Sequence, residues 1–140
     1  MAIKTYQGSC HCGAVRFEAD LDLSEGTYRC NCSICAKARS WFALVPPERF
    51  RMLAGARNQT EYQWALQGRS ASNLHYCFCK TCGIRTPGRG ERGLQGGPFF
   101  FIPVAALDNV GAEERASATI RFLDGRNDRP ERTPEDTRWL

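Results

Sequence analysis

The sequence predicts a small, mainly β domain that is stabilised by bound metal. Short segments of alternating apolar and polar residues, separated by turn-forming residues, indicate strands, and few segments have the period of a helix. Eight cysteines fall in three groups, at positions 10–12, 30–35 and 77–82, which is typical of metal ligands. The length of 140 residues suits one domain with a core of its own.

Seven segments have the sequence pattern of strands. Residues 14–19 place Val15 and Phe17 on one face and charged residues on the other, as in a strand buried on one side. Residues 40–45 are more continuously apolar and end at a pair of prolines. Similar patterns predict five further strands, at residues 50–55, 60–66, 73–78, 98–104 and 118–123.

Helices are predicted only as short pieces, around residues 34–39 and 104–107. The glycine-rich segment 88–97 lacks the strand-to-helix context of a phosphate-binding loop, so we interpret it as a mobile loop that could cover a site. Residues 124–140 are polar and contain prolines. We therefore expect a domain over residues 1–123, followed by a tail over 124–140 that packs on the domain or is partly disordered.

Charge and hydropathy disfavour several classes of protein. No apolar run approaches the roughly 20 residues of a membrane span, and the N-terminal residues have no apolar signal region, so we expect a cytoplasmic protein. The formal net charge is +4, and the 16 arginines are spread along the chain. This dispersion makes a nucleic-acid partner unlikely, whereas a mild positive excess suits small anionic molecules.

The spacing of the cysteines favours metal binding over disulfides. Residues two apart on an extended segment have Cα atoms about 6.6 Å apart, near the outer limit for a disulfide, and their side chains point the same way. A metal gathers such thiolates easily. A cytoplasmic compartment would also keep the thiols reduced.

The cysteines divide into one complete ligand set and one incomplete set. Four thiolates from two pairs could form a closed tetrahedral site. These four are Cys10, Cys12, Cys79 and Cys82. Gly83, after the last of them, permits the left-handed turn of a metal knuckle.

The incomplete set has three ligands, which is the pattern of a catalytic zinc with an open position. Its members are Cys30, Cys32 and Cys35. Cys77 could close this second site, or it could be a small half-buried thiol on the strand that leads to Cys79.

Four motifs of the sequence resemble those of one known family. They are GSCHCGAVRF, YRCNCSICAK, FCKTCG and VAALD, and they lie between about residues 7 and 108. The family is that of the glutathione-dependent formaldehyde-activating (Gfa-like) enzymes, which includes centromere protein V and shares the β-tent fold with exchange-factor-like zinc proteins. The resemblance implies this fold and two zinc ions per chain. It implies a structural zinc on the four-cysteine set and a catalytic zinc on Cys30, Cys32 and Cys35, while Cys77 departs from the family pattern.

The resemblance and the open ligand set together predict an enzyme. A zinc ion on three thiolates carries a net negative formal charge and suits a soft fourth ligand, such as a substrate thiol. Glutathione bound in this way could add to formaldehyde to give S-(hydroxymethyl)glutathione, and the reverse reaction is carbon–sulfur cleavage. The alternative is a non-catalytic zinc-binding module, either a glutathione carrier or a protein or chromatin interaction domain. The sequence predicts no particular oligomeric state.

Several residues near the cysteines are candidates for the substrate pocket. Arg29, Lys37 and Arg39 flank the three-cysteine motif, where they could supply positive charge to substrate carboxylates or remain solvated surface charges. Trp41 and Phe42 could form a wall of the pocket or belong to the core.

The chain has two histidines, and neither is expected to bind metal. His11 lies between two predicted ligands, so its ring should point away from that metal, either on the surface or into the pocket. His75 lies on a predicted strand, where a packed or hydrogen-bonded ring is expected.

Overall fold

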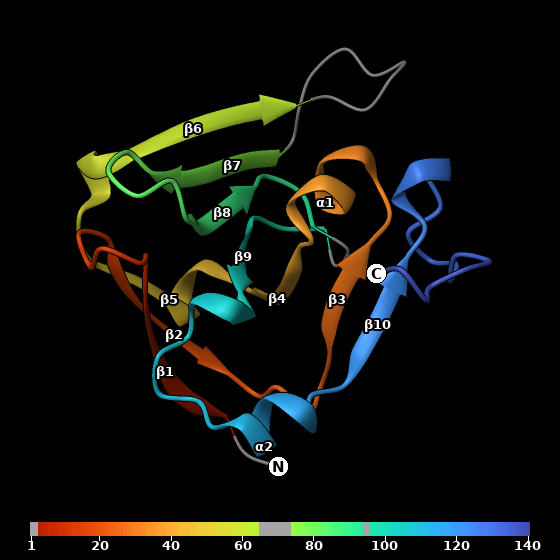
Figure 1. Cartoon of the computed structure of the whole chain (residues 1–140), viewed down its shortest axis with the longest axis horizontal. Coiled ribbons are helices and arrows are strands. Elements are labelled where there is room, and N and C mark those ends of the chain that lie inside the picture. Colours follow the sequence, from red (N-terminus) through yellow and green to blue (C-terminus); the bar gives the residue numbers. More distant parts are fainter. Residues whose placement is uncertain (1–2, 65–73, 94–95) are drawn as a thin grey trace.

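The computed structural model describes residues 3–64, 74–93 and 96–140, which form two β-sheets (Figure 1). The smaller sheet is antiparallel, with the strand order β1-β2-β5. Its strands are β1 (Lys4–Ser9), β2 (Arg16–Leu21) and β5 (Phe50–Ala54). The larger sheet has the order β10-β3-β4-β9-β8-β7-β6, and only the β10–β3 pair of its described strands is parallel. Its strands are β3 (Thr27–Cys30), β4 (Trp41–Val45), β6 (Gln59–Trp64), β7 (Leu74–Cys79), β8 (Arg85–Gly90), β9 (Phe99–Pro103) and β10 (Ile120–Leu123).

Helical structure is limited to short pieces between the strands. Helix α1 (Ser33–Ala38) connects β3 to β4, and α2 (Ala112–Ala116) precedes β10. Four 3₁₀ turns complete the described elements: η1 (Pro47–Arg49), η2 (Ala56–Asn58), η3 (Val104–Ala106) and η4 (Gly125–Asn127). Within the described residues, no helix has the length and apolar character needed to cross a membrane.

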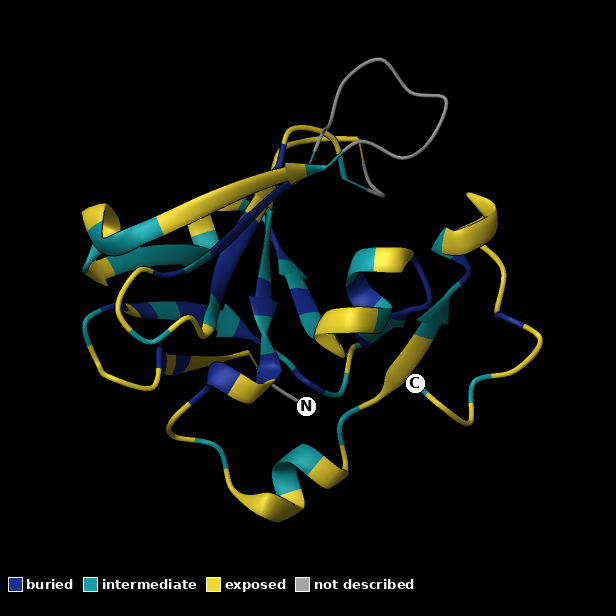
Figure 2. Ribbon diagram, turned by 45° about the horizontal axis from the view of Figure 1, so that its top comes forward, coloured by how far each residue is buried: buried dark blue, intermediate teal, exposed yellow. Residues whose placement is uncertain are grey.

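The hydrophobic core lies between the smaller sheet and the β4–β9 part of the larger one (Figure 2). Phe17 of β2 and Ile102 of β9 are fully buried there, together with Val104 and Leu107 after β9. Burial of each such side chain stabilises the fold by about 1.5–3 kcal/mol. The ring of Phe17 lies directly over Gly8 on β1, where a Cβ atom would come within 2.2 Å of the ring. The core therefore joins the N-terminal hairpin to the centre of the larger sheet.

The predicted fold class is confirmed, because strands dominate the described residues and the helices are short. All seven predicted strands exist, with ends shifted by a few residues. Residues 65–66 and 73 of two of these predictions lie outside the described residues. The predicted helical pieces correspond to α1 and η3. Strands β1, β3 and β8 and helix α2 were not predicted, because they are short or lack a clear apolar period.

The prediction of a loop at residues 88–97 was wrong at its start. Gly88 and Gly90 belong to β8, and the rings of Phe101 and Phe99 on the neighbouring strand β9 occupy the space above them. A Cβ atom at Gly88 would lie 2.1 Å from the Phe101 ring. The glycines thus allow aromatic side chains to pack on a strand, which composition alone does not distinguish from a loop. Residues 94–95 lie outside the described residues.

Residues 124–140 follow β10 and contact the rest of the chain. Asp124 is buried, and the Arg39 guanidinium donates to the carbonyl oxygen of Trp139 at 3.4 Å. The tail is therefore in contact with the region around α1. Its status as a unit separate from residues 1–123 stays a prediction.

Candidate metal centres and the cleft beside them

The four-cysteine cluster consists of Cys10, Cys12, Cys79 and Cys82, whose sulfur atoms all lie within 4.8 Å of one another. The first pair follows β1, and the second lies at the end of β7 and in the turn after it. The Cys10–Cys12 and Cys12–Cys79 sulfur distances are 3.6 and 3.7 Å. Thiolates at about 2.3 Å from a tetrahedral zinc lie about 3.8 Å apart, so the spacing fits that ion.

Backbone and amide donors surround the four sulfur atoms. The N–H groups of Val15 and Thr81 lie 3.3 Å from Cys10 Sγ and Cys79 Sγ, respectively. The backbone N–H groups of Cys12 and Ile84 lower the pKa of Cys82 to about 6. Such donors stabilise thiolates, which are the form that binds metal.

Glycines shape the turn after each cysteine pair. Gly13 has φ of 82° and Gly83 has φ of 77°, both in the left-handed region. Their N–H groups donate to the carbonyl oxygens of Cys10 and Cys79 at 3.3 and 2.9 Å. The expected left-handed turn at Gly83 is confirmed. The two knuckles face each other and form a closed set of four cysteines that could hold a metal ion.

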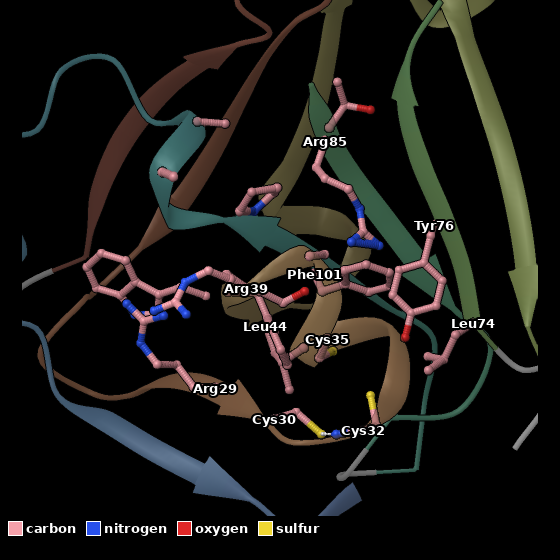
Figure 3. A pocket seen from close by; sticks show the side chains of 18 of the residues that line it. Arg29, Cys30, Cys32, Cys35, Arg39, Leu44, Leu74, Tyr76, Arg85 and Phe101 are labelled. Atoms are coloured by element: carbon pink, nitrogen blue, oxygen red, sulfur yellow. Dashed lines mark hydrogen bonds between the residues drawn. The ribbon is translucent and has the colours of Figure 1, made fainter. Parts of the chain in front are cut away.

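The three-cysteine cluster consists of Cys30, Cys32 and Cys35, whose sulfur atoms also lie within 4.8 Å of one another. Cys30 ends β3, Cys32 is the N-cap of α1, and Cys35 lies within α1. All three are buried, and the N–H of Cys32 donates to Cys30 Sγ at 3.5 Å (Figure 3). Hydrogen bonds from the Cys32 and Cys35 thiols lower the pKa of Cys30.

The three-cysteine cluster has no fourth ligand of its own among the described residues. No described histidine, aspartate, glutamate or further cysteine joins the group. Cys77 is buried on β7, opposite Glu61 of β6, and belongs to neither cluster. Burial raises the pKa of its thiol. Its neighbour Tyr76 faces the three-cysteine cluster across a cleft, whereas Cys77 does not line that cleft.

The three-cysteine cluster lies in a cleft of about 1010 Å³ (Figure 3). Strands β3, β4, β6, β7, β8, β9 and β10 of the larger sheet all contribute lining residues, so the cleft lies over one face of that sheet, and Ser9 of β1 also lines it. Its apolar lining includes Leu44, Tyr76 and Phe101. Burial, followed by the nearby Cys35 thiol, raises the pKa of Tyr76, which keeps its hydroxyl protonated. The cleft is therefore a partly apolar chamber beside the three cysteines.

Arginines supply positive charge to the cleft. Arg29 and Arg39 line one side, and Arg85 lines the opposite side (Figure 3). Burial, followed by the nearby charge of Arg39, lowers the pKa of Arg29. Within the described part of the chain, none of these three arginines forms an ion pair. Two like charges side by side that form no ion pair among the described residues could attract an anionic ligand, although Asp108 and Asp128 also line the cleft.

Of the other candidate residues, some line the cleft and others lie on the surface outside it. Lys37 is exposed on α1 and does not line the cleft, so it is a solvated charge. Trp41 and Phe42 line the cleft and also pack against buried clusters, so they serve both expected roles. His11 is exposed at the cleft mouth. His75 is hydrogen-bonded to Glu61 and Glu91 at 2.9 Å each, which confirms the expected hydrogen-bonded ring.

Sequence reasoning did not assign Tyr76 and Arg85 to the cleft. Tyr76 alternates with Leu74 in the predicted strand 73–78, and this period could have placed both on one face. Arg85 lies on β8, which was not predicted, so no pattern assigned it to the site. Its guanidinium lies 4.8 Å from the centroid of the Tyr76 ring.

The fold and the two cysteine clusters define a mainly β protein that could hold metal in two places. One cluster is closed, with four cysteines, and the other is open, with three cysteines in a cleft. The chain matches the family model of the glutathione-dependent formaldehyde-activating enzyme over residues 5–123. It therefore belongs to that family, which supports a function related to glutathione and formaldehyde. It also resembles a crystal structure of a Rhodobacter sphaeroides protein, with 28% identity and a TM-score of 0.65. That match covers 82% of this chain and 99% of the other.

Proposed function

We propose that the protein is a zinc-dependent carbon–sulfur lyase that joins glutathione, or a related thiol, to formaldehyde and cleaves the adduct in reverse. The observation that carries the proposal is the position of three buried cysteines in a cleft, with no fourth ligand among the described residues. The family to which the chain belongs supports the same chemistry.

The residues present fit zinc at both clusters. Thiolates are the ligands of structural zinc sites, and the sulfur spacing of the four-cysteine cluster matches tetrahedral coordination. We assign the structural zinc to Cys10, Cys12, Cys79 and Cys82. We assign the catalytic zinc to Cys30, Cys32 and Cys35. When bound there, zinc supplies an open position that favours the thiolate form of a substrate thiol.

The reaction needs one new bond and one proton transfer. The substrate sulfur forms a bond to the carbon of formaldehyde, and the electrons of the carbonyl π bond move to oxygen. That oxygen then takes up the proton that the thiol has lost. Tyr76 is our candidate donor of a hydrogen bond to this oxygen, because its hydroxyl faces Cys32 and burial keeps it protonated (Figure 3).

Arg29 and Arg39 are our candidates for binding a substrate carboxylate. Arg39 ends α1 with φ of 51°, a left-handed conformation in which glycine or asparagine is usual. Holding a non-glycine residue in this conformation costs on the order of 1 kcal/mol. The Arg39 side chain lines the cleft. Glutathione carries carboxylates at both ends of a central thiol. Arginines on two sides of the cluster suit that shape.

Exchange NMR tests the proposal by measuring the rate at which glutathione, formaldehyde and their adduct interconvert. The rate with zinc-loaded protein should exceed the spontaneous rate, and Cys30→Ser should return it to the spontaneous rate while the fold is retained. Cys77→Ser is the matched control, since Cys77 is also buried but lies outside both clusters. Binding of glutathione by the wild-type protein without any rate above background would identify a glutathione carrier instead.

A further inference from the structure

The short segment after β10 encloses Asn31, the residue between Cys30 and Cys32. Asn31 is buried. Three of its polar groups bond to this segment, and a fourth bonds to Leu123, the last residue of β10. Its N–H donates to the carbonyl of Leu123 at 3.2 Å, and its side-chain amide donates to Asp124 Oδ1 at 2.9 Å. Its side-chain and backbone oxygens accept from Arg126 N and Nε, at 2.9 and 3.2 Å. The Cys30–Cys32 backbone is therefore held from outside its own strand and helix.

Asp124 is the centre of this segment. Only 2% of the residue is exposed, and its carboxylate accepts from Asn31, from Asn127 at 3.0 Å and from Arg132 at 2.7 Å. Its backbone N–H donates to the carbonyl of Arg132, and its carbonyl accepts from the N–H of Arg129. A buried carboxylate needs such a set of donors to offset its desolvation. Residues 124–132 thus fold around one carboxylate.

Gly125 approaches the cysteines more closely than any other residue type could. A Cβ atom at this position would lie 2.5 Å from Cys30 Sγ and 3.1 Å from the Cβ of Cys32. Glycine is required here because the Cys30 sulfur occupies the space that a side chain at position 125 would need. Gly125 also lines the cleft, together with Asp128 and Pro130 of the same segment.

We propose that Asp124 and Gly125 are positioning residues of the three-cysteine metal site. Asp124 fixes Asn31, and with it the separation of Cys30 and Cys32, while the close packing of Gly125 against Cys30 Sγ sets the position of that sulfur. Both residues lie beyond residue 123, where the family match ends, so a site formed within the matched region is completed by the segment that follows it. The inference rests on the proposed function only in requiring that the three cysteines bind a metal.

Metal affinity at the two clusters provides the test, with the four-cysteine cluster as an internal reference. The full-length protein is titrated with zinc against a coloured chelator, in wild type and in the variants Gly125→Ala and Asp124→Asn. We expect the affinity of one site to fall by about 10–100-fold in each variant, as for residues that support metal ligands, and the other site to remain unchanged. Gly111→Ala is the matched control, because a Cβ atom there meets nothing within 4 Å.

A double-mutant cycle separates positioning from general stabilisation. Asn31→Ala and Asp124→Ala should each weaken metal binding at the three-cysteine cluster. The loss in the double variant should be smaller than the sum of the two single losses, since both variants remove the Asn31–Asp124 hydrogen bond. Additive losses, unchanged affinity in both test variants, equal loss at both clusters, or unfolding of every variant would each overturn the inference. A wild-type protein that binds a single zinc would instead overturn the proposed function.

Discussion

The guanidinium of Arg29 lies over the indole ring of Trp41, 5.0 Å from its centroid. The indole N–H donates to the hydroxyl of the buried Thr27 at 2.8 Å, which fixes the ring and the cation stacked on it. This stacking leaves the N–H groups at the edge of the guanidinium free to reach a ligand. The charge is therefore held in place before any substrate arrives.

This arrangement predicts that Arg29 contributes to the binding of substrates that carry a carboxylate. Arg29→Ala should raise KM for glutathione by about 10–100-fold, since charge-assisted hydrogen bonds contribute roughly 1.5–3 kcal/mol. Activity with 2-mercaptoethanol, which has no carboxylate, should change little. Lys37→Ala is the control, because that charge is exposed outside the cleft. Equal effects on both thiols would contradict the assignment.

Tyr76→Phe should lower kcat while leaving KM for glutathione nearly unchanged. The variant retains the ring that packs in the cleft but removes the hydroxyl, which we expect to stabilise the developing charge on the formaldehyde oxygen. Loss of one such donor lowers kcat by roughly 10²–10³-fold in enzymes that depend on it. Tyr62→Phe, on the exposed face of β6, should behave as wild type. A rise in KM alone would assign Tyr76 to substrate packing.

The two cysteine clusters should differ in their effect on stability. Cys79→Ser removes a cysteine from the cluster that joins the N-terminal region to β7, so it should lower Tm sharply. Cys35→Ser removes a ligand from the open cluster and should lower Tm by much less. Differential scanning calorimetry with and without chelator makes the comparison. Similar losses of Tm in the two variants would show that both clusters are structural.

His75 should make stability depend on pH above neutrality. Its hydrogen bond to Glu61, and a second to Glu91, raise the pKa of the ring, while Arg89 nearby opposes the shift. The stabilisation is therefore complete below the unfolded pKa of about 6.5 and is lost as pH rises through the higher folded pKa. Because both carboxylates are partly exposed, we expect at most about 1 kcal/mol.

Urea denaturation of wild type and of His75→Gln between pH 6 and pH 9 measures this contribution. The difference in the free energy of unfolding should be largest at pH 6 and should decrease toward pH 9. A difference that is constant over this range would mean that the ring acts through packing and not through its charge.

The sequence predicted the cysteine clusters better than the rest of the site, for a physical reason. A metal requires particular ligand types at short spacing, so the pairs around Cys10 and Cys79 are recognisable without knowledge of the fold. Strand alternation likewise identifies half-buried strands such as β2. Arg85 and Asp124 carry no local signal, because each acquires its role through contacts with residues distant in the chain. Only the folded chain reveals the segment that encloses Asn31.

The two clusters also differ in how much of the chain each needs before it can form. The three-cysteine cluster spans residues 30–35, so during synthesis its ligands are together as soon as that stretch is made. The four-cysteine cluster must wait for β7, because 66 residues separate Cys12 from Cys79, and closing that loop costs chain entropy. Asp124 and Gly125 come later still. A nascent chain therefore carries the three thiols without their enclosing segment for most of its synthesis.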